Sequence, residues 1–325
     1  MTRGVLVVIG VGLLAWASFF AIADRQGHAA DDTGKGSPAV ADTAASCVPT
    51  GYVKVFGDEF NEARLDTSRW WTRYIYADGT LDFLNDEQQR YRENGNHVMT
   101  DHSLILMARK AKPNSDDIDY ESGMIRSKKT FKYGYFEARA KVPGGLGVRP
   151  GFWLNSARRA KDGKIAWPPE IDIFEFAYNG VEDKANMLHS GVLSNGPQHT
   201  KMLFKDANYH NDWTYWNAPY NFPDAFHVYS ALWQDDNTVT VYVDCQRIYK
   251  LSYKWVYDDH TPAAYAHVLL NLAIGGEWAG RHGIDDAAFP QGLEIDYVRV
   301  YQKAGHEVGG TDDLGKDLCP AKGGC

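Results

Sequence analysis

Three carboxylates lie within six residues of an otherwise apolar segment, Glu170-Ile171-Asp172-Ile173-Phe174-Glu175. The segment is rich in β-branched and aromatic residues, and this composition favours a strand. A buried strand has no structural need for three acids, because each unpaired buried charge costs several kcal/mol. These carboxylates therefore either face solvent or are kept for chemistry.

Alternation along the strand determines which of these acids can act together. Glu170 and Asp172 share a face, whereas Glu175 would point to the opposite face of a regular strand. One extra residue near Ile173 and Phe174, a β-bulge, would return Glu175 to the face of the other two acids. Two glutamates that flank an aspartate have the residue types that glycoside hydrolysis requires. A divalent-cation site and a solvated acidic face are the alternatives.

Composition limits the class of protein. The chain has 325 residues, of which 44% are hydrophobic, enough for one large all-β domain or two ordinary ones. Its 10 Trp and 19 Tyr suit a sugar-binding groove and also suit any β-rich core. The net charge of −8, without a basic cluster, argues against non-specific nucleic-acid binding. The sequence motifs of serine hydrolases, zinc proteases and phosphate-binding loops are absent.

The two ends of the chain differ in composition from its middle. Residues 1–23 resemble a secretory signal peptide, which predicts a secreted or periplasmic protein. The apolar run of residues 5–23 is also long enough to span a bilayer, so an uncleaved membrane anchor is the alternative. Residues 24–46 have the composition of a flexible linker, and residues 304–325 that of a polar tail.

Four cysteines agree with export to an oxidising compartment, and they allow three full pairings. The short spacing of Cys319 and Cys325 favours a bond between them. A bond from Cys47 to Cys319, which would join the ends of the domain, is an alternative; the fourth cysteine is Cys245.

Short alternating segments separated by Gly, Asn, Asp and Pro predict an all-β sandwich or barrel. Asp235-Asp236-Asn237 predicts a hairpin turn. Short helical turns are expected near residues 223–227 and 285–289. The expected strands are 53–56, 97–108, 133–142, 152–154, 228–233, 239–243, 268–273 and 293–301, in addition to the acidic segment.

The acidic segment and its surroundings resemble glycoside hydrolase family 16. The resemblance runs over roughly residues 50–302 and rests on an ordered set of segments around the Glu-x-Asp-x-x-Glu motif. They are Gly57–Asn61, Leu65–Trp70, Tyr133–Lys141, Pro150–Leu154, Leu270–Trp278 and Ile295–Gln302. The resemblance implies a catalytic domain over residues 47–303, folded as a β-jelly-roll of two curved antiparallel sheets.

The family resemblance also implies catalytic roles. Glu170 would be the nucleophile, Glu175 the acid and then the base, and the charge of Asp172 would raise the pKa of a neighbouring Glu. A retaining pair requires carboxyl groups about 5–5.5 Å apart, whereas an inverting pair requires about 6.5–9.5 Å. Four strand steps place the two Cα atoms about 13 Å apart, so bulge compression and long side chains must close the gap.

The residues expected to bind the sugar surround this motif. Core packing is the alternative role for Trp153, a surface salt bridge for Arg126, and a structural role for His189. By their positions in the family pattern, the candidates are Asn85, Gln89, Arg126, Trp153, Trp167, His189, Asn271 and Trp278.

No cofactor is expected for catalysis, but the resemblance implies a structural Ca²⁺ away from the groove. Its ligands would be Asp296 and the main-chain carbonyls of Glu59 and His102, because an all-oxygen set suits Ca²⁺.

The expected function is that of a secreted, monomeric, retaining endo-β-glycanase acting on β-1,3- or mixed β-1,3/1,4-glucan. A bacterial exopolysaccharide or a galactan is the alternative substrate. The sequence would also agree with a transglycosylase or with a lectin-like, non-catalytic jelly roll. Pro168-Pro169, Cys245 and residues 178–221 depart from the laminarinase pattern, and these departures bear on the substrate rather than on the reaction.

Overall fold

The structure is a computed structural model. It describes residues 47–76, 79–113, 118–156, 168–193, 200–210, 214–257, 260, 262–263 and 265–311, all within the unit Ser46–Cys325. The expected signal segment and linker, Trp167, Cys319 and Cys325 lie outside the described residues, as does the tail beyond residue 311.

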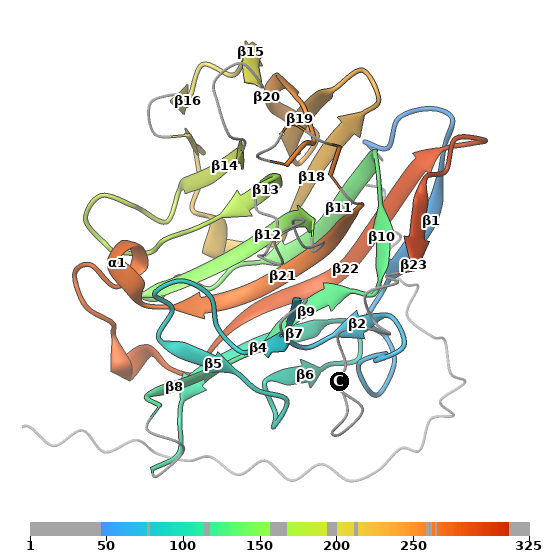
Figure 1. Ribbon diagram of the computed structural model, residues 1–325. Helices are drawn as coiled ribbons and strands as arrows, with labels where there is room; N and C mark the ends of the chain where they lie inside the picture. The colour runs from blue at the N-terminus through green and yellow to red at the C-terminus, as the bar shows by residue number, and fades with distance from the viewer. Residues whose placement is uncertain are drawn as a thin grey trace, which may run out of the picture. The chain divides into compact units, whose positions relative to one another are not determined.

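One layer of the described chain is an eleven-stranded sheet (Figure 1). Its neighbours run in the order β15-β20-β19-β18-β11-β22-β7-β8-β5, with β1 against β22 and β6 against β7. The strands are β1 (Tyr52–Asp58), β5 (Gln89–Tyr91), β6 (His97–Met99), β7 (Leu104–Lys110), β8 (Tyr120–Ser122), β11 (Gly134–Lys141), β15 (Thr200–Lys205), β18 (His227–Gln234), β19 (Thr238–Val243), β20 (Gln246–Tyr253) and β22 (Gln291–Lys303).

The second layer is a ten-stranded sheet that contains the acidic segment as β13. Its order is β16-β17-β14-β13-β12-β21-β10-β23, with β9 against β21 and β2 against β9. The strands are β2 (Trp70–Trp71), β9 (Met124–Ser127), β10 (Lys129–Phe131), β12 (Val148–Ser156), β13 (Glu170–Glu175), β14 (Met187–Leu193), β16 (Tyr209–His210), β17 (Tyr215–Asn217), β21 (Ala266–Ile274) and β23 (Gly309–Thr311).

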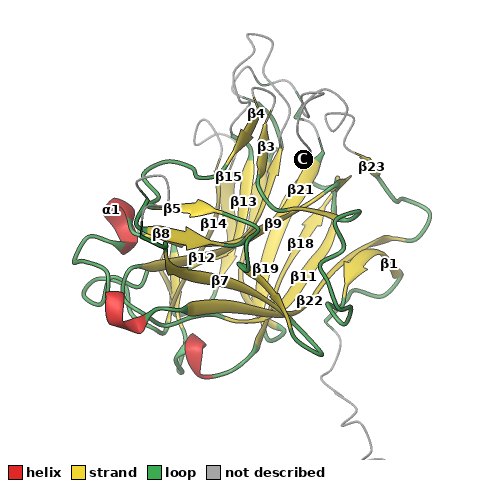
Figure 2. Ribbon diagram, turned by 90° about the horizontal axis from the view of Figure 1, so that it is seen from below, coloured by secondary structure: helices red, strands yellow, loops and turns green. Residues whose placement is uncertain are grey.

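Helical structure in the described residues is limited to short turns (Figure 2). Beside a small hairpin of β3 (Tyr74–Tyr76) and β4 (Gly79–Leu81), the chain forms α1 (Gly276–Ala279) and the 3₁₀ turns η2 (Phe222–Asp224) and η3 (Asp286–Ala288). A short 3₁₀ turn therefore lies near each of the two predicted helical turns, although η2 ends at Asp224 and residue 227 already begins β18. The helix α1 was not predicted. The all-β sandwich is confirmed.

One predicted strand is wrong in its extent. Residues 97–108 form two strands, β6 and β7, which pair with each other. Between them Thr100 and Ser103 close a turn, in which the Thr100 N–H donates to the Ser103 carbonyl at 2.8 Å and the two hydroxyls lie 2.7 Å apart. Side-chain hydrogen bonds of this kind favour a turn over continued strand pairing, and they are the local reason for the break.

Apolar residues fill the space between the two sheets. On β11, Phe136, Ala138 and Ala140 are fully buried, and the β13 residues Ile171 and Phe174 meet them in the same core. A second, smaller apolar cluster contains Tyr74, Tyr91, Met124, Trp153 and Leu269. Because Trp153 alternates along β12 with the core residues Phe152 and Leu154, this second cluster lies on the opposite face of the sheet, away from the core.

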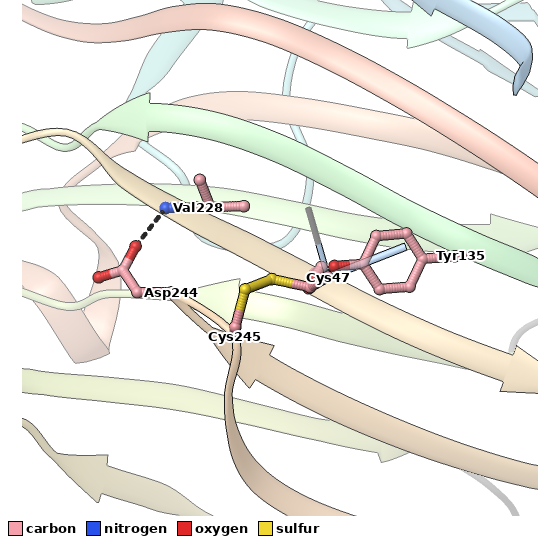
Figure 3. Close-up of a disulfide and its surroundings, with 6 residues drawn as sticks. Cys47, Tyr135, Val228, Asp244 and Cys245 are labelled. Carbon is pink, nitrogen blue, oxygen red and sulfur yellow. Dashed lines mark hydrogen bonds between the residues drawn. A yellow bond between two sulfur atoms is a disulfide. The ribbon is translucent and has the colours of Figure 1, made fainter. Parts of the chain in front are cut away.

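A disulfide joins Cys47 to Cys245, which follows β19 (Figure 3). The predicted alternative of a Cys47–Cys319 bond is wrong, because Cys47 is already paired; a Cys319–Cys325 bond would lie outside the described residues. Asp244 and Cys245 have φ of 47° and 65°, in the left-handed region. The Asp244 carboxylate stabilises this turn by accepting the Val228 N–H at 2.8 Å.

Candidate active site

A β-bulge at Ile173 brings the three acids to one face of β13. Asp172 pairs with Trp153 and Phe174 pairs with Phe152, so Ile173 has no partner on β12. The same irregularity appears on the β14 side, between Asp172 and Glu175. The apolar residues Ile171, Ile173 and Phe174 are fully buried in the core, while the acids line the other face. The predicted bulge is confirmed.

The acids open into a cleft with a volume of about 420 Å³. Its walls come from β12, β13, β21, the β3 strand and the segment before β5. The lining residues are Tyr74, Leu84, Asn85, Glu87, Arg149, Gly151, Trp153, Asn155, Glu170, Asp172, Glu175 and Asn271. Of the expected sugar-binding residues, the structure therefore brings Asn85, Trp153 and Asn271 together with the three acids.

Asp172 is the most buried of the three acids, with 6% of its surface exposed. Burial raises the pKa of the Asp172 carboxyl well above its usual value, and the nearby charges of Glu170 and Glu175 raise it further. Asp172 also forms a side-chain hydrogen bond with Glu170. Burial and the two neighbouring carboxylates therefore both favour the protonated form of Asp172. The expectation that the charge of Asp172 raises the pKa of a neighbouring Glu stays a prediction.

Hydrogen bonds hold Glu170 and the aromatic floor in place. The Asn155 amide donates to Glu170 Oε2 at 3.3 Å. Trp153 Nε1 donates to Asn271 Oδ1 at 2.9 Å, and Asn271 Nδ2 donates to the Tyr91 hydroxyl at 3.0 Å. These bonds fix the indole ring, so Trp153 both packs in the second apolar cluster and presents a surface to the cleft.

Arg149 and Glu87 are cleft residues that were not predicted. Arg149 Nη2 lies 3.2 Å from Glu87 Oε1, and both side chains are largely buried. Alternation on β12 was the available signal, since Arg149, Gly151, Trp153 and Asn155 share one face. Of these four residues only Trp153 was predicted to lie in the site, and alternation was not applied to its neighbours on β12.

Two expected sugar contacts are buried away from the cleft lining. Gln89 is fully buried; its Oε1 accepts the Ile274 N–H at 2.7 Å and its Nε2 donates to Glu87 at 2.8 Å. Arg126 is 1% exposed, and its guanidinium lies 5.3 Å from the centre of the Trp71 ring. Both side chains thus support neighbouring strands, which corrects the expectation of direct sugar contact and, for Arg126, of a surface salt bridge.

His189 and Trp278 lie together beside Glu175. His189 is the cross-strand partner of Glu175, and its ring meets the Trp278 ring edge-on at 4.7 Å. Asp183 joins them, because its carboxylate accepts from Trp278 Nε1 at 2.9 Å and contacts His189 Nε2. This cluster extends the acidic face beyond the residues that line the cleft. Asp183 was not predicted, and it lies within the segment that departs from the laminarinase pattern.

Two of the three residues expected to bind calcium, Asp296 and Glu59, form ion pairs at their side chains. Arg139 Nη1 lies 2.6 Å from Asp296 Oδ2, and Arg299 Nη2 lies 2.6 Å from Glu59 Oε2. Among the residues that the structure describes, no group of three or more His, Cys, Asp or Glu side chains is placed to hold a metal ion. A guanidinium next to Asp296 opposes cation binding there. The other two expected ligands are the main-chain carbonyls of Glu59 and His102, which the arrangement of side chains does not test. The calcium site stays a prediction.

A jelly roll that carries two glutamates and an aspartate on one face of a cleft defines a glycoside hydrolase. The chain matches the family model described as the GH16 domain of β-porphyranases A–D over residues 52–303. It therefore belongs to glycoside hydrolase family 16.

The names of individual relatives refer to different substrates. The chain is 30% identical to glucan endo-1,3-β-glucosidase A1 of Niallia circulans over 77% of its length and 38% of that protein. It is 30% identical to a β-glucanase of Rhodothermus marinus, over 76% of its length and 84% of that protein. It is also 26% identical to the keratan-sulfate endo-1,4-β-galactosidase of Sphingobacterium multivorum, over 80% of its length and 57% of that protein.

The solved laminarinase domain of Thermotoga petrophila RKU-1 has the same fold. The TM-score is 0.61 at 27% identity, and the match covers 78% of this chain and 98% of that domain. In the described residues no helix is long and apolar enough to cross a membrane.

Proposed function

We propose that this chain is a retaining endo-β-glycanase that hydrolyses β-1,3- or mixed β-1,3/1,4-glucan. The observation that carries the proposal is the bulge at Ile173, which puts Glu170 and Glu175 on one face of a cleft with Asp172 between them. Two glutamates flanking a scissile bond are the arrangement that double displacement requires. The glucanase names among the relatives support the choice of glucan.

In the first step Glu170 Oε attacks the anomeric carbon while the Glu175 carboxylic acid gives its proton to the departing glycosidic oxygen. The carbon–oxygen bond to the leaving sugar breaks, and a glycosyl ester forms on Glu170. In the second step the Glu175 carboxylate takes a proton from water, whose oxygen attacks the anomeric carbon and releases the Glu170 carboxylate. In this proposal Asp172 is protonated and donates a hydrogen bond to Glu170, which stabilises the charge that returns to Glu170.

The second candidate substrate is a β-linked galactan that carries anionic groups. The family model of β-porphyranases and the keratan-sulfate galactosidase among the relatives support it. Arg149 also places a guanidinium in the cleft, although Glu87 already pairs with it. A lectin-like protein is disfavoured because sugar binding alone does not need three acids gathered on a bulged strand.

Export from the cytoplasm is part of the proposal. It rests on the signal-like residues 1–23 and on the Cys47–Cys245 disulfide, which suits an oxidising compartment. The catalytic unit is expected to act as a monomer.

Hydrolysis of a polysaccharide panel tests the proposal. Purified protein is incubated with laminarin, lichenan, agar, carrageenan, porphyran and xyloglucan, and the product sizes are measured. We expect internal cleavage of laminarin or lichenan, with the anomeric configuration kept in the first NMR spectra of the products. Cleavage of only the galactans would transfer the assignment to the second candidate, and an inverted first product would exclude double displacement.

A further inference from the structure

The main chain of Glu170 is held from the opposite sheet by a tyrosine hydroxyl. Tyr253, on β20, accepts the Glu170 N–H at 3.0 Å, and its hydroxyl lies 3.0 Å from the Glu170 carbonyl and 2.6 Å from the Leu193 carbonyl. Glu170 and Leu193 are cross-strand partners on β13 and β14. One fully buried tyrosine therefore bridges the two strands at the residue that carries the proposed nucleophile.

A second bridge of the same kind lies two residues further along β13. The Ser190 hydroxyl donates to the Asp172 carbonyl at 2.8 Å, and the Tyr249 hydroxyl lies 3.3 Å from Ser190 Oγ. Tyr209 donates to the Ser190 carbonyl at 3.2 Å. Tyr249 and Tyr253 are four residues apart on β20, so they lie on the same face of that strand and reach the catalytic strand side by side.

The Ser190 bond lies beside an interruption in the pairing of β13, and the Tyr253 bonds lie at Glu170, the first residue of that strand. The bulge leaves Ile173 without a partner on β12, and on the β14 side the register shifts between Asp172 and Glu175. A strand whose ladder is broken is less firmly held by its neighbours than a regular one. Hydrogen bonds from buried side chains, from Ser190 on the neighbouring strand and from Tyr253 in the opposite sheet, can supply additional constraint, because their donors and acceptors are buried and cannot exchange with water.

We propose that Tyr253, together with the Tyr249–Ser190 pair, is a positioning residue that sets the distance and angle of Glu170 toward the sugar. The inference rests on the proposed function, in which Glu170 is the nucleophile. Neither tyrosine lines the cleft, so the effect acts through the main chain. Burial raises the pKa of both hydroxyls well above their usual value, so they stay protonated over the range of an enzyme assay.

The variant Tyr253→Phe keeps the ring and removes only the hydroxyl. Because a misplacement of about 1 Å can cost about 100-fold in rate, we expect kcat to fall about tenfold or more while KM changes less than about twofold. The fall should be equally large for an aryl glycoside with a dinitrophenolate leaving group, made from the oligosaccharide that the wild-type enzyme releases. That leaving group needs no proton from Glu175, so the loss is assigned to attack by Glu170.

Tyr229→Phe is the matched control. The Tyr229 ring also packs on the catalytic strand, with its centre 4.5 Å from that of Phe174. Its hydroxyl is buried, but within the described part of the chain it has no hydrogen-bond partner. Removing this hydroxyl is expected to leave kcat within about twofold, because no positioning bond is lost. Both variants are compared at the same fraction of folded protein, measured by circular dichroism.

Equal kcat values for the two variants would overturn the inference, as would a Tyr253→Phe effect confined to KM or to the melting temperature. Should Tyr253→Phe fail to fold, Ser190→Ala takes its place, since it removes the second bridge, and an unchanged kcat in that variant counts equally against the inference. Failure of the proposed function looks different: the wild-type enzyme would cut no glycan, or Glu170→Gln would stay fully active.

Discussion

Asp172 forms a hydrogen bond with Glu170, and Asp172 is the more deeply buried of the two carboxyl groups. Three acids gathered on one face cannot all be ionised at low cost, so one of them must keep its proton. Burial raises the pKa of the Asp172 carboxyl, so a proton is favoured on this member of the group. The proposed roles of Glu170 and Glu175 depend instead on their positions on either side of the scissile bond.

The raised pKa of Asp172 predicts how stability depends on pH. Its folded-state pKa is raised, so the folded protein binds a proton that the unfolded chain has released. The free energy of unfolding therefore contains a contribution from Asp172 that is present below the ordinary aspartate pKa and is lost as pH rises through the raised value. Asp172→Asn should remove this loss. Between about pH 4 and about pH 9 the melting temperature of the variant should rise relative to that of the wild type as pH increases. Parallel plots of melting temperature against pH would contradict the assignment.

Glu170→Gln tests the role of the proposed nucleophile. The amide keeps the shape and the Asn155 contact but cannot form the glycosyl ester, so we expect kcat to fall by about 1,000-fold or more. Oligosaccharide binding, measured by calorimetry, should remain within about tenfold, because the cleft is otherwise intact. Addition of azide to Glu170→Gly should restore turnover of an activated aryl glycoside and give a glycosyl azide of inverted configuration. Full activity of Glu170→Gln would remove the central claim.

The acidic face could be predicted because alternation and a bulge are local properties of one strand. The period of two separates Ile171 from Glu170 and Asp172, and the bulge moves Phe174 to the apolar face and Glu175 to the acidic face; the structure confirms this separation. Asn85, Trp153 and Asn271 were found because they lie in segments that resemble family 16. The burial of Gln89 and Arg126 could not be predicted, because it depends on strands that pair across long distances in the chain.

Three of the residues that were not predicted meet their partners across long distances in the chain. Arg149 and Glu87 meet across 62 residues, and Tyr253 reaches Glu170 across 83 residues. Alternation on β12 marks the face on which Arg149 lies, but no local pattern marks its contact with Glu87 or that of Tyr253 with Glu170. These contacts depend on which strands become neighbours and on how the two sheets stack. The pairing of Cys245 with Cys47 depends in the same way on where the turn after β19 lies.

The Arg149–Glu87 pair predicts a coupled effect on stability. Arg149→Met leaves the buried Glu87 carboxylate without its counter-ion, and breaking such a pair costs about 3–5 kcal/mol of unfolding free energy. Glu87→Gln should cost less, because the amide can still accept from the Leu84 N–H, which now donates to the carboxylate at 3.0 Å. In the double variant we expect about 1–3 kcal/mol to be recovered relative to the sum of the single changes. Additive losses in urea denaturation would show that the two residues act independently.

Calcium binding is tested by chelation. A bound ion that prefers the folded state would raise the melting temperature in proportion to the logarithm of its concentration. The Arg139–Asp296 ion pair competes with such an ion, so Arg139→Gln should strengthen any calcium effect. Identical melting with EDTA and with millimolar Ca²⁺, in both the wild type and this variant, would eliminate the site.

The Cys47–Cys245 disulfide links residues 198 apart in the sequence, and this separation determines its expected contribution. Closing so long a loop in the unfolded chain corresponds to about 5 kcal/mol in the chain-entropy treatment, which sets an upper bound. Cys245→Ser should therefore lower the melting temperature by several degrees, as should treatment of the wild type with reductant. The cleft is built from other strands, so kcat at a temperature where the variant is folded should stay within about twofold. Reductant should have little further effect on the melting temperature of Cys245→Ser, and a large further loss would show that another bond carries the stabilisation.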